Sequence, residues 1–395
     1  MNPADTPDRG DPLAVWLLAV GQTLIYASLY YAFAALLPSL VTATGWSKAQ
    51  LAAGPTLAFL ITAGLTPVTG RLVDRGWGGD MLIWMPGLGA LGLVGLGFAK
   101  TPGVWLALWA VVGVAQAGSF YETCFAFLTR RLGGGARAAI TRVTLVAGFA
   151  GTLAFPLGAV LAQAFGGQGA LVAFAALVVL GAVPVNVLAV RRLRRLDLAG
   201  VGRPAPEPGA LMAALRRPAF WGIGAIFGLT YLSHSILVTY ALVLFAERGA
   251  AAGVAVLAAS CIGPAQVAGR AVLMMNETRV STKAATVWSL GSVVGAAVLL
   301  WLAGMAPVLI FGFALLQGAG LGLSSILRPV LLAEVLGRRG FGSISGAAAV
   351  APILGTAAGP VVGAWLFGIG PSAVYGACLA MAAAGFGIGL VLLRR

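Results

Sequence analysis

The chain has 395 residues, of which 60% are hydrophobic and only 9% are charged, and it carries a formal net charge of +14. Soluble domains have roughly 25% charged residues, so this composition excludes a water-soluble fold and indicates a membrane protein. The basic residues stand between apolar runs, where they set topology, so we expect the lipid bilayer and no nucleic acid as a partner.

Cysteine and histidine usage excludes the common metal sites. His234 is the only histidine, and Cys124, Cys261 and Cys378 each lie alone inside an apolar run, without paired spacing. We therefore expect no metal and no cofactor. The polar segments contain no nucleophile–base pattern and no phosphate-binding loop, so the sequence predicts that the chain is not an enzyme.

Twelve apolar runs are long enough to cross a bilayer, which takes about 20 residues of helix. The sequence therefore predicts an all-α membrane protein with twelve transmembrane helices. Ser47 and Gln50 form a capping-box pattern at the start of the second run, and Ser281 can cap the ninth. The predicted spans are residues 13–38, 48–70, 82–100, 104–129, 139–165, 169–190, 218–245, 252–275, 284–302, 306–332, 344–367 and 372–392.

The first span carries a polar stripe. Gln22, Tyr26 and Tyr30 are spaced by four residues and therefore share one face of a helix. A face with this many polar atoms is typical of a cavity wall, and helix packing is the alternative. We predict that these three side chains bind substrate.

Residues 67–76 form a short polar segment between the second and third spans. Gly70 would allow two helices to approach closely, and Asp74 could accept hydrogen bonds from the amides at the start of a neighbouring helix. The pattern of Gly70, Leu72, Asp74 and Arg75 resembles the signature loop of the major facilitator superfamily of transporters. The resemblance implies a gating role for Gly70, Asp74 and Arg75, in which the segment stabilises the outward-open state.

Arginine and lysine are concentrated in alternate inter-span segments, which the positive-inside rule assigns to the cytoplasm. Both termini are then cytoplasmic, and the expected location is the plasma (inner) membrane. The longest polar interruption is basic and contains prolines, so we interpret it as a cytoplasmic linker. The predicted parts are a tail at 1–11, a six-helix bundle at 12–190, the linker at 191–217 and a second six-helix bundle at 218–395.

The two predicted bundles are related by an internal repeat. Matching positions are separated by a constant 204 residues (355 − 151). Two pseudo-symmetric bundles with glycine and proline at matching positions are typical of secondary transporters, whose substrate binds between the halves. Chance coincidence in a plain helical bundle is the alternative. The repeat relates Gly151, Thr152, Ala154, Pro156 and Gly166 to Gly355, Thr356, Ala358, Pro360 and Gly370, and Leu132 and Gly133 to Leu336 and Gly337.

Arg270 in the eighth span is the main substrate-binding candidate, because an ionisable group inside a span is costly and usually functional. A guanidinium that faces an aqueous cavity can hold a carboxylate through two parallel hydrogen bonds. Reaching out to the inner lipid headgroups is the alternative. With Gln266 and Gly269, Arg270 resembles the eighth span of the bacterial branch near the monocarboxylate and oxalate–formate transporters, which implies a substrate-binding arginine. The aspartate of the proton-coupled carriers is replaced here by Gln266.

Two other ionisable groups lie inside spans and keep several interpretations open. Glu122 in the fourth span could carry a coupling proton, contact substrate or form a structural pair with Arg142 of the fifth span. His234 lies near Tyr231 in a polar stretch of the seventh span, where it is a second candidate for proton coupling, as a proton or anion switch, or could be a hydrogen-bonded core residue. We predict that Tyr231, His234 and Gln266 contribute to the substrate site.

The leading prediction is a monomeric secondary active or facilitative transporter of a small organic solute, a mono- or dicarboxylate anion. It would work by alternating access, as a symporter, antiporter or uniporter, with a proton as the other potential partner. Proton-coupled efflux of hydrophobic compounds and a membrane sensor without transport are the alternatives. Near the cytoplasmic ends of the spans, Arg131, Arg328 and Glu334 are assigned to the gate.

Overall fold

The computed structural model describes residues 11–195 and 209–394, and every regular element in these ranges is helical. Within these described ranges, ten helical stretches are long and apolar enough to cross a membrane. Large apolar side chains such as Trp84, Leu180 and Met305 stay exposed, which is stable where the surroundings are lipid tails. The structure therefore agrees with the prediction of an all-α, multi-pass membrane protein.

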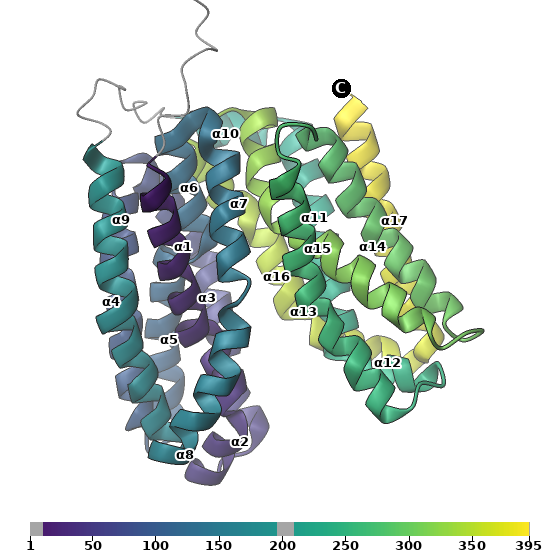
Figure 1. Cartoon of the computed structure of the whole chain (residues 1–395), viewed down its shortest axis with the longest axis horizontal. Coiled ribbons are helices and arrows are strands. Elements are labelled where there is room, and N and C mark those ends of the chain that lie inside the picture. Colours follow the sequence, from purple (N-terminus) through teal and green to yellow (C-terminus); the bar gives the residue numbers. More distant parts are fainter. Residues whose placement is uncertain (1–10, 196–208, 395) are drawn as a thin grey trace, which may run out of the picture. The chain divides into compact units, whose positions relative to one another are not determined.

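The chain divides into two compact units (Figure 1). Unit 1 comprises the described residues up to Leu211 together with Arg338–Ala347, and unit 2 comprises Met212–Gly337 and the described residues from Ala348 onward. Helix α16 (Phe341–Ile369) consequently starts in unit 1 and continues in unit 2.

The short helix α10 (Ala210–Leu215) also crosses the boundary between the units, and the remaining helices belong to one unit each. Unit 1 contains α1 (Pro12–Tyr26), the π-helical turn η2 (Ala27–Tyr31), α2 (Ala32–Thr44), α3 (Lys48–Asp74), α4 (Gly78–Gly97), α5 (Pro102–Ser119), α6 (Tyr121–Leu132), the 3-10 turn η3 (Gly133–Gly135), α7 (Ala136–Ala147), α8 (Ala150–Leu177), the π-helical turn η4 (Val178–Ala182) and α9 (Val183–Arg195). Unit 2 contains α11 (Pro218–Thr239), α12 (Ala241–Glu247), α13 (Ala252–Met275), α14 (Thr282–Leu302), α15 (Leu309–Leu336) and α17 (Pro371–Arg394).

Two helix starts expected from the sequence carry their caps. At the start of α3, the Gln50 N–H donates to Ser47 Oγ at 3.2 Å and the Ser47 N–H donates to Gln50 Oε1 at 2.9 Å, which completes the capping box. At the start of α14, the Ala284 N–H donates to Ser281 Oγ at 3.2 Å. Each cap satisfies amides that the first helical turn leaves without a backbone partner.

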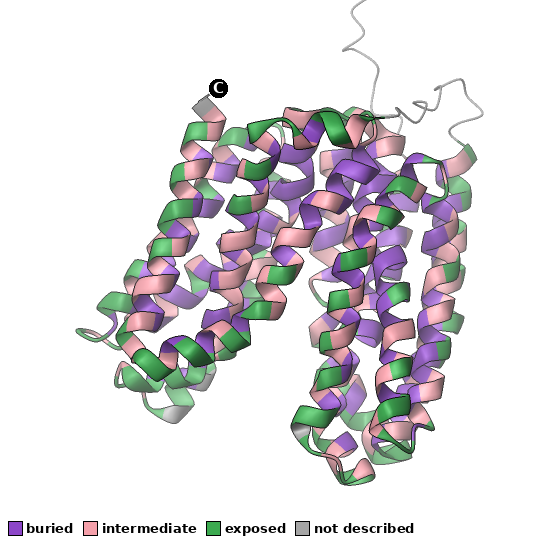
Figure 2. Ribbon diagram, turned by 180° about the vertical axis from the view of Figure 1, so that it is seen from behind, coloured by how far each residue is buried: buried purple, intermediate pink, exposed green. Residues whose placement is uncertain are grey.

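The same packing pattern occurs in both units. In unit 1, α3 and α4 pack against α5, and in unit 2, α13 and α14 pack against α15. Glycine makes both crossings possible. A Cβ at Gly113 on α5 would lie 2.7 Å from the Ala58 carbonyl, and a Cβ at Gly318 on α15 would overlap the Ile262 carbonyl. Buried residues accordingly lie on the helix sides that face other helices of the same unit (Figure 2).

The backbone agrees with the predicted internal repeat. Gly133 and Gly337 have φ of 54° and 95°, and they follow the last residues of α6 and α15. Gly166 and Gly370 also have positive φ, 71° and 144°, and they interrupt α8 and separate α16 from α17. Glycine adopts positive φ more readily than other residues do. The 204-residue displacement therefore relates glycines that end or interrupt helices in the same way.

We expect Gly318→Ala to destabilise the protein, because the added methyl group would meet the Ile262 carbonyl and, at 2.6 Å, the Ala265 Cβ. Overpacking at such a crossing costs about 1–3 kcal/mol. Gly263→Ala on α13 is the matched control, because its Cβ would meet nothing within 4 Å. Thermal unfolding of the purified protein measures both variants, and equal unfolding temperatures would contradict the close crossing.

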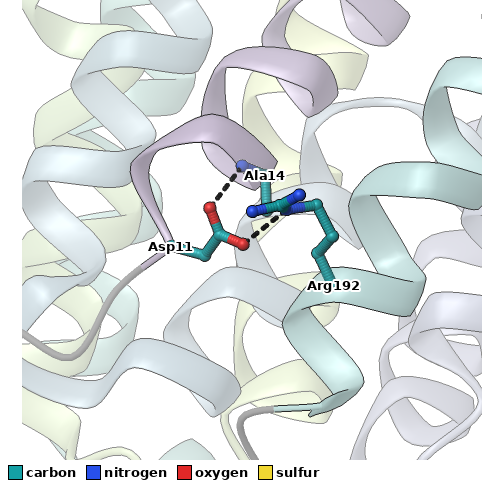
Figure 3. A network of polar contacts seen from close by, with 3 residues as sticks. All are labelled: Asp11, Ala14 and Arg192. Carbon is teal, nitrogen blue, oxygen red and sulfur yellow. Dashed lines mark hydrogen bonds and ion pairs between the residues drawn. The ribbon is translucent and has the colours of Figure 1, made fainter.

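Both ends of the first predicted bundle differ in detail from the sequence prediction. Asp11, placed in the tail, is the N-cap of α1, and the Ala14 N–H donates to its carboxylate at 3.1 Å (Figure 3). Residues 191–195, placed in the linker, continue α9, and Arg192 Nε lies 2.6 Å from the Asp11 carboxylate. The rest of the predicted tail, residues 1–10, and linker residues 196–208 lie outside the described residues.

The Asp11–Arg192 contact has a defined pH dependence. Partial burial is the largest single influence and raises the pKa of Asp11, but the hydrogen bonds from Arg192 and the Ala14 and Leu13 amides, together with the positive charge of Arg192, lower the pKa overall. A carboxyl with a lowered pKa contributes to stability above its ordinary pKa, and the contribution is lost as the pH falls through the lowered value. The cap is therefore intact at neutral pH.

Candidate functional site

The fourth predicted span is broken in the middle. α5 ends at Ser119, α6 starts at Tyr121, and Phe120 between them is extended, with φ −78° and ψ −174°. A break inside a membrane span leaves backbone groups without helical partners, so it is tolerated where other groups satisfy them or where it lines a cavity. Glu122 lies in the first turn of α6, where a helix N-terminus favours negative charge.

Two side chains of the predicted polar stripe form hydrogen bonds with backbone groups on either side of the break. Gln22 donates from Nε2 to the Ser119 carbonyl at 2.8 Å, and the Tyr26 hydroxyl accepts the Tyr121 N–H at 3.3 Å. Gln22 is fully buried. Both side chains therefore hold the broken backbone in place, and a contact between either of them and a substrate stays a prediction.

Aromatic rings surround the same break. Tyr26 stacks on Phe120 with ring centroids 4.2 Å apart and lies 4.4 Å from the Tyr121 ring. Tyr30, in the π-helical turn η2, is 36% exposed and contacts Phe59 edge-on at 5.5 Å. Rings arranged in this way offer flat apolar surface together with hydroxyl groups, which suits the organic part of a ligand.

We expect Gln22→Leu to lower the free energy of unfolding, because the Ser119 carbonyl would remain buried without its donor. Such a loss costs on the order of 1–3 kcal/mol. Gln163→Leu, at an exposed position of α8, is the matched control and should have little effect. Denaturation of the purified variants measures the difference. An unchanged stability of Gln22→Leu combined with altered substrate affinity would assign Gln22 to the substrate instead of the backbone.

α15 is the central helix of the candidate site in unit 2, where α13 and α11 pack against it. His234 on α11 places Nδ1 3.1 Å from Gln317 Nε2. Arg270 on α13 donates from Nε to the Gly322 carbonyl at 3.3 Å. The two contacts are five residues apart along α15, a separation of about 7.5 Å on the helix axis.

Arg270 is only 6% exposed, although its guanidinium is charged at every physiological pH. Glycines bring the two helices together around it. A Cβ at Gly269 would lie 2.8 Å from the Ala319 carbonyl, and a Cβ at Gly322 would overlap the backbone of Gln266. The hydrogen bond to Gly322 orients the side chain toward α15. Gln266 itself is half-buried, as is Tyr231, which lies three residues before His234 on α11.

The segment from Gly70 to Arg75 is helical further than predicted, because α3 continues through Asp74 and Arg75 is its C-cap. The Asp74 carboxylate accepts hydrogen bonds from the Gly342 N–H at 2.7 Å, the Ser343 N–H at 2.7 Å and the Ser343 hydroxyl at 2.6 Å. These groups open α16, so the contact is of the kind expected for an aspartate at a helix N-terminus. A Cβ at Gly70 would overlap the Gly342 carbonyl, which explains the glycine.

Arg130 contacts the end of α3 that carries Asp74, and this role was not predicted from the sequence. Its guanidinium donates to the carbonyls of Asp74 and, at 3.3 Å, of Val73, where α3 ends. A basic side chain at a helix C-terminus has the favourable sign. The adjacent Arg131 lies over the Phe127 ring instead, at 5.5 Å. The sequence offers the Arg130–Arg131 pair as a signal, but nothing in it says which member turns toward α3.

The other predicted gate and coupling residues lie on α15 and α7. Arg328 is 5% exposed on α15, and Glu334 Oε1 accepts a hydrogen bond from the Thr282 hydroxyl at 2.7 Å. Arg142 is half-buried on α7. A contact between Glu122 and Arg142 stays a prediction, as do the gating roles.

Comparison with known proteins found a matching family model and similar solved structures. Residues 18–351 match the family model of the Major Facilitator Superfamily. The structure of the human organic anion transporter MFSD10 (TETRAN) is similar with a TM-score of 0.71 and 18% identity, covering 98% of this chain and 100% of that chain. The proton:xylose symporter XylE, bound to 6-bromo-6-deoxy-D-glucose, is similar with a TM-score of 0.69 and 14% identity, covering 96% and 95%.

At these identities the likeness to solved structures concerns the fold alone. No curated protein sequence matches the chain. The family model, in contrast, spans well over half of the sequence and includes the Gly70–Arg75 segment, the broken fourth span and Arg270. The chain therefore belongs to the Major Facilitator Superfamily.

Proposed function

We propose that the chain is a twelve-span transporter of a small organic anion, a mono- or dicarboxylate, that works by alternating access in the plasma (inner) membrane. Ten candidate spans are described, and one of them, Pro102–Arg195, is 94 residues long. Its helix is interrupted at Gly133–Gly135 and at Gly166. Dividing it there gives three spans and raises the total from ten to twelve.

The observation that carries the anionic substrate is the burial of Arg270. Placing a permanent charge inside a membrane span is expensive, and such residues usually mark the path of a solute or ion. The guanidinium is oriented by its Nε hydrogen bond to Gly322, and an arginine held this way can bind a carboxylate more specifically than an ammonium group can. This is the role implied by the resemblance to the monocarboxylate and oxalate–formate branch.

The structural neighbours support the proposal only in part. One is an organic anion transporter and the other is a sugar symporter, so one fold serves charged and neutral solutes. The fold alone does not determine which solute is transported. The choice of a carboxylate therefore rests on Arg270.

We propose further that the Asp74 contact is a conformational latch. α16 begins in unit 1, where Asp74 holds its first amides, and it continues in unit 2. A movement of unit 2 that pulls on α16 would have to break these bonds. The contact would thus stabilise one end state of the transport cycle, as the resemblance to the signature loop implies.

A binding screen tests the substrate class. The purified protein would be heated with a panel of short mono- and dicarboxylates and with the amide counterpart of each. A ligand at 100 times its Kd stabilises a protein by about 2.7 kcal/mol, which shifts the unfolding temperature measurably. We expect at least one carboxylate to stabilise the protein and its amide to have no effect. Stabilisation by the amides alone would contradict an anionic substrate.

The aromatic surface of unit 1 favours a second candidate function, proton-coupled efflux of hydrophobic compounds. Phe120 and Tyr121 directly precede Glu122 in the chain, and the rings of Tyr26 and Tyr30 contact Phe120, so a flat apolar compound bound at these rings would lie near a carboxyl group. Drug-driven proton movement in proteoliposomes, lost in Glu122→Gln, would support this function. A carboxylate flux that survives Glu122→Gln would favour the leading proposal.

A further inference from the structure

Unit 2 contains a pocket of about 1050 Å³ that is lined by none of the predicted substrate-binding residues, although Glu334, a predicted gate residue, forms part of its wall. It lies where the first turns of α11 and α14 meet the last turns of α15 and α17. Because the ends of membrane-spanning helices lie near the membrane surface, the pocket is at lipid headgroup depth. Its polar side chains are Arg217, Lys283 and Glu334, and its walls include Leu331, Val335, Ile388, Val391 and Leu392.

Two glycines create the space between α11 and α17. A Cβ at Gly387 would meet nothing within 4 Å, and a Cβ at Gly222 would make only ordinary contact, 3.7 Å from Ile388 Cγ2. Both glycines line the pocket. The apolar part of the pocket is therefore an open groove along α17 and does not close into a packed core.

The polar part of the pocket favours an anion. Arg217 and Lys283 are both exposed and stand at the starts of α11 and α14, where the helix N-termini add positive potential. The Glu334 carboxylate is engaged by the Thr282 hydroxyl at 2.7 Å. The pocket lining thus contains two cations and one carboxylate, and that carboxylate already accepts a hydrogen bond.

We propose that this pocket binds an anionic phospholipid. The phosphate would lie against Arg217 and Lys283, and one acyl chain would follow the apolar wall formed by Leu331, Val335 and α17. Basic side chains above an apolar groove at a helix end match both parts of such a lipid. A free inorganic phosphate would use the cations and leave the groove empty, so the groove argues for the lipid.

Native mass spectrometry of the full chain, released from micelles that contain phosphatidylglycerol or phosphatidylcholine, tests the proposal. The wild type should retain phosphatidylglycerol selectively, and the double variant R217Q/K283Q should retain about tenfold less. R216Q/R279Q is the matched control, because it removes the same charge from two exposed arginines of unit 2 that do not line the pocket. This control should retain the lipid as the wild type does.

Gly387→Phe separates the lipid from a free anion, because it fills the groove and leaves both cations in place. We expect it to lose phosphatidylglycerol, and we expect inorganic phosphate not to displace the lipid from the wild type. Thermal unfolding without lipid checks that each variant is folded. Equal retention by R217Q/K283Q and its control, equal retention of phosphatidylcholine, or unchanged retention by Gly387→Phe would each overturn the proposal. None of these readouts depends on the transported solute.

Discussion

Arg270→Ala should strongly reduce carboxylate uptake, and Arg270→Lys should restore only a part of it. A hydrogen bond to a charged group contributes roughly 1.5–3 kcal/mol, so we expect uptake by the alanine variant to fall roughly 10- to 100-fold. Lysine keeps the positive charge but lacks the planar fork that binds both carboxylate oxygens, and it cannot reproduce the Nε contact with Gly322. Uptake into proteoliposomes of the carboxylate found in the binding screen is the measurement.

Two controls make this result specific. Arg279→Ala removes an exposed arginine from the turn after α13 and should leave uptake unchanged. Because Arg270 is buried between packed helices, the unfolding temperature of each variant must also be measured. A folded Arg270→Ala variant that transports every carboxylate at the wild-type rate would remove the basis for an anionic substrate.

Asp74→Asn should release the start of α16 and impair transport at least tenfold. The carboxylate accepts three short hydrogen bonds from Gly342 and Ser343, whereas asparagine offers one oxygen and turns an N–H₂ group toward the same donors. Losing these charge-assisted bonds costs on the order of 3 kcal/mol. Since 1.4 kcal/mol changes an equilibrium tenfold, the distribution of conformational states should shift strongly.

Hydrogen exchange of the peptide that contains Gly342 and Ser343 measures the release directly. It should become at least tenfold faster in Asp74→Asn. Asp80→Asn is the control, because Asp80 is also an aspartate at a helix start but pairs with Arg194 at 2.7 Å. If exchange at the start of α16 is the same in Asp74→Asn as in the wild type, the latch proposal is wrong.

Composition and patterning predicted the features that depend on solvent and local chain chemistry. The apolar runs gave the helices, Ser47 and Ser281 marked two helix starts, and the 204-residue displacement related glycines that share positive φ. Glycine at position 70 suggested a close approach, which the Gly342 carbonyl provides. Such features are readable because each has a strong preference for one residue type.

Features that depend on distant partners were not readable. No local sequence pattern predicts that the fourth span breaks at Phe120. The role of Gln22 as a hydrogen-bond donor to the Ser119 carbonyl becomes visible only in the folded structure, where the two residues are neighbours. A stripe of polar side chains looks the same whether it serves a substrate or a broken helix. The choice of Arg130 over Arg131 at the end of α3 likewise depends on tertiary contact. Sequence therefore located the helices better than the partners of their polar groups.

The most direct test of the central claim is flux of a matched pair of solutes through the purified protein in liposomes. The pair is a carboxylate that stabilises the protein and the amide of the same size and shape. An anion transporter built around Arg270 predicts carboxylate entry well above protein-free liposomes, inhibited by other carboxylates, with no entry of the amide. Equal entry of both compounds, or no entry of the carboxylate above the protein-free level, would contradict it.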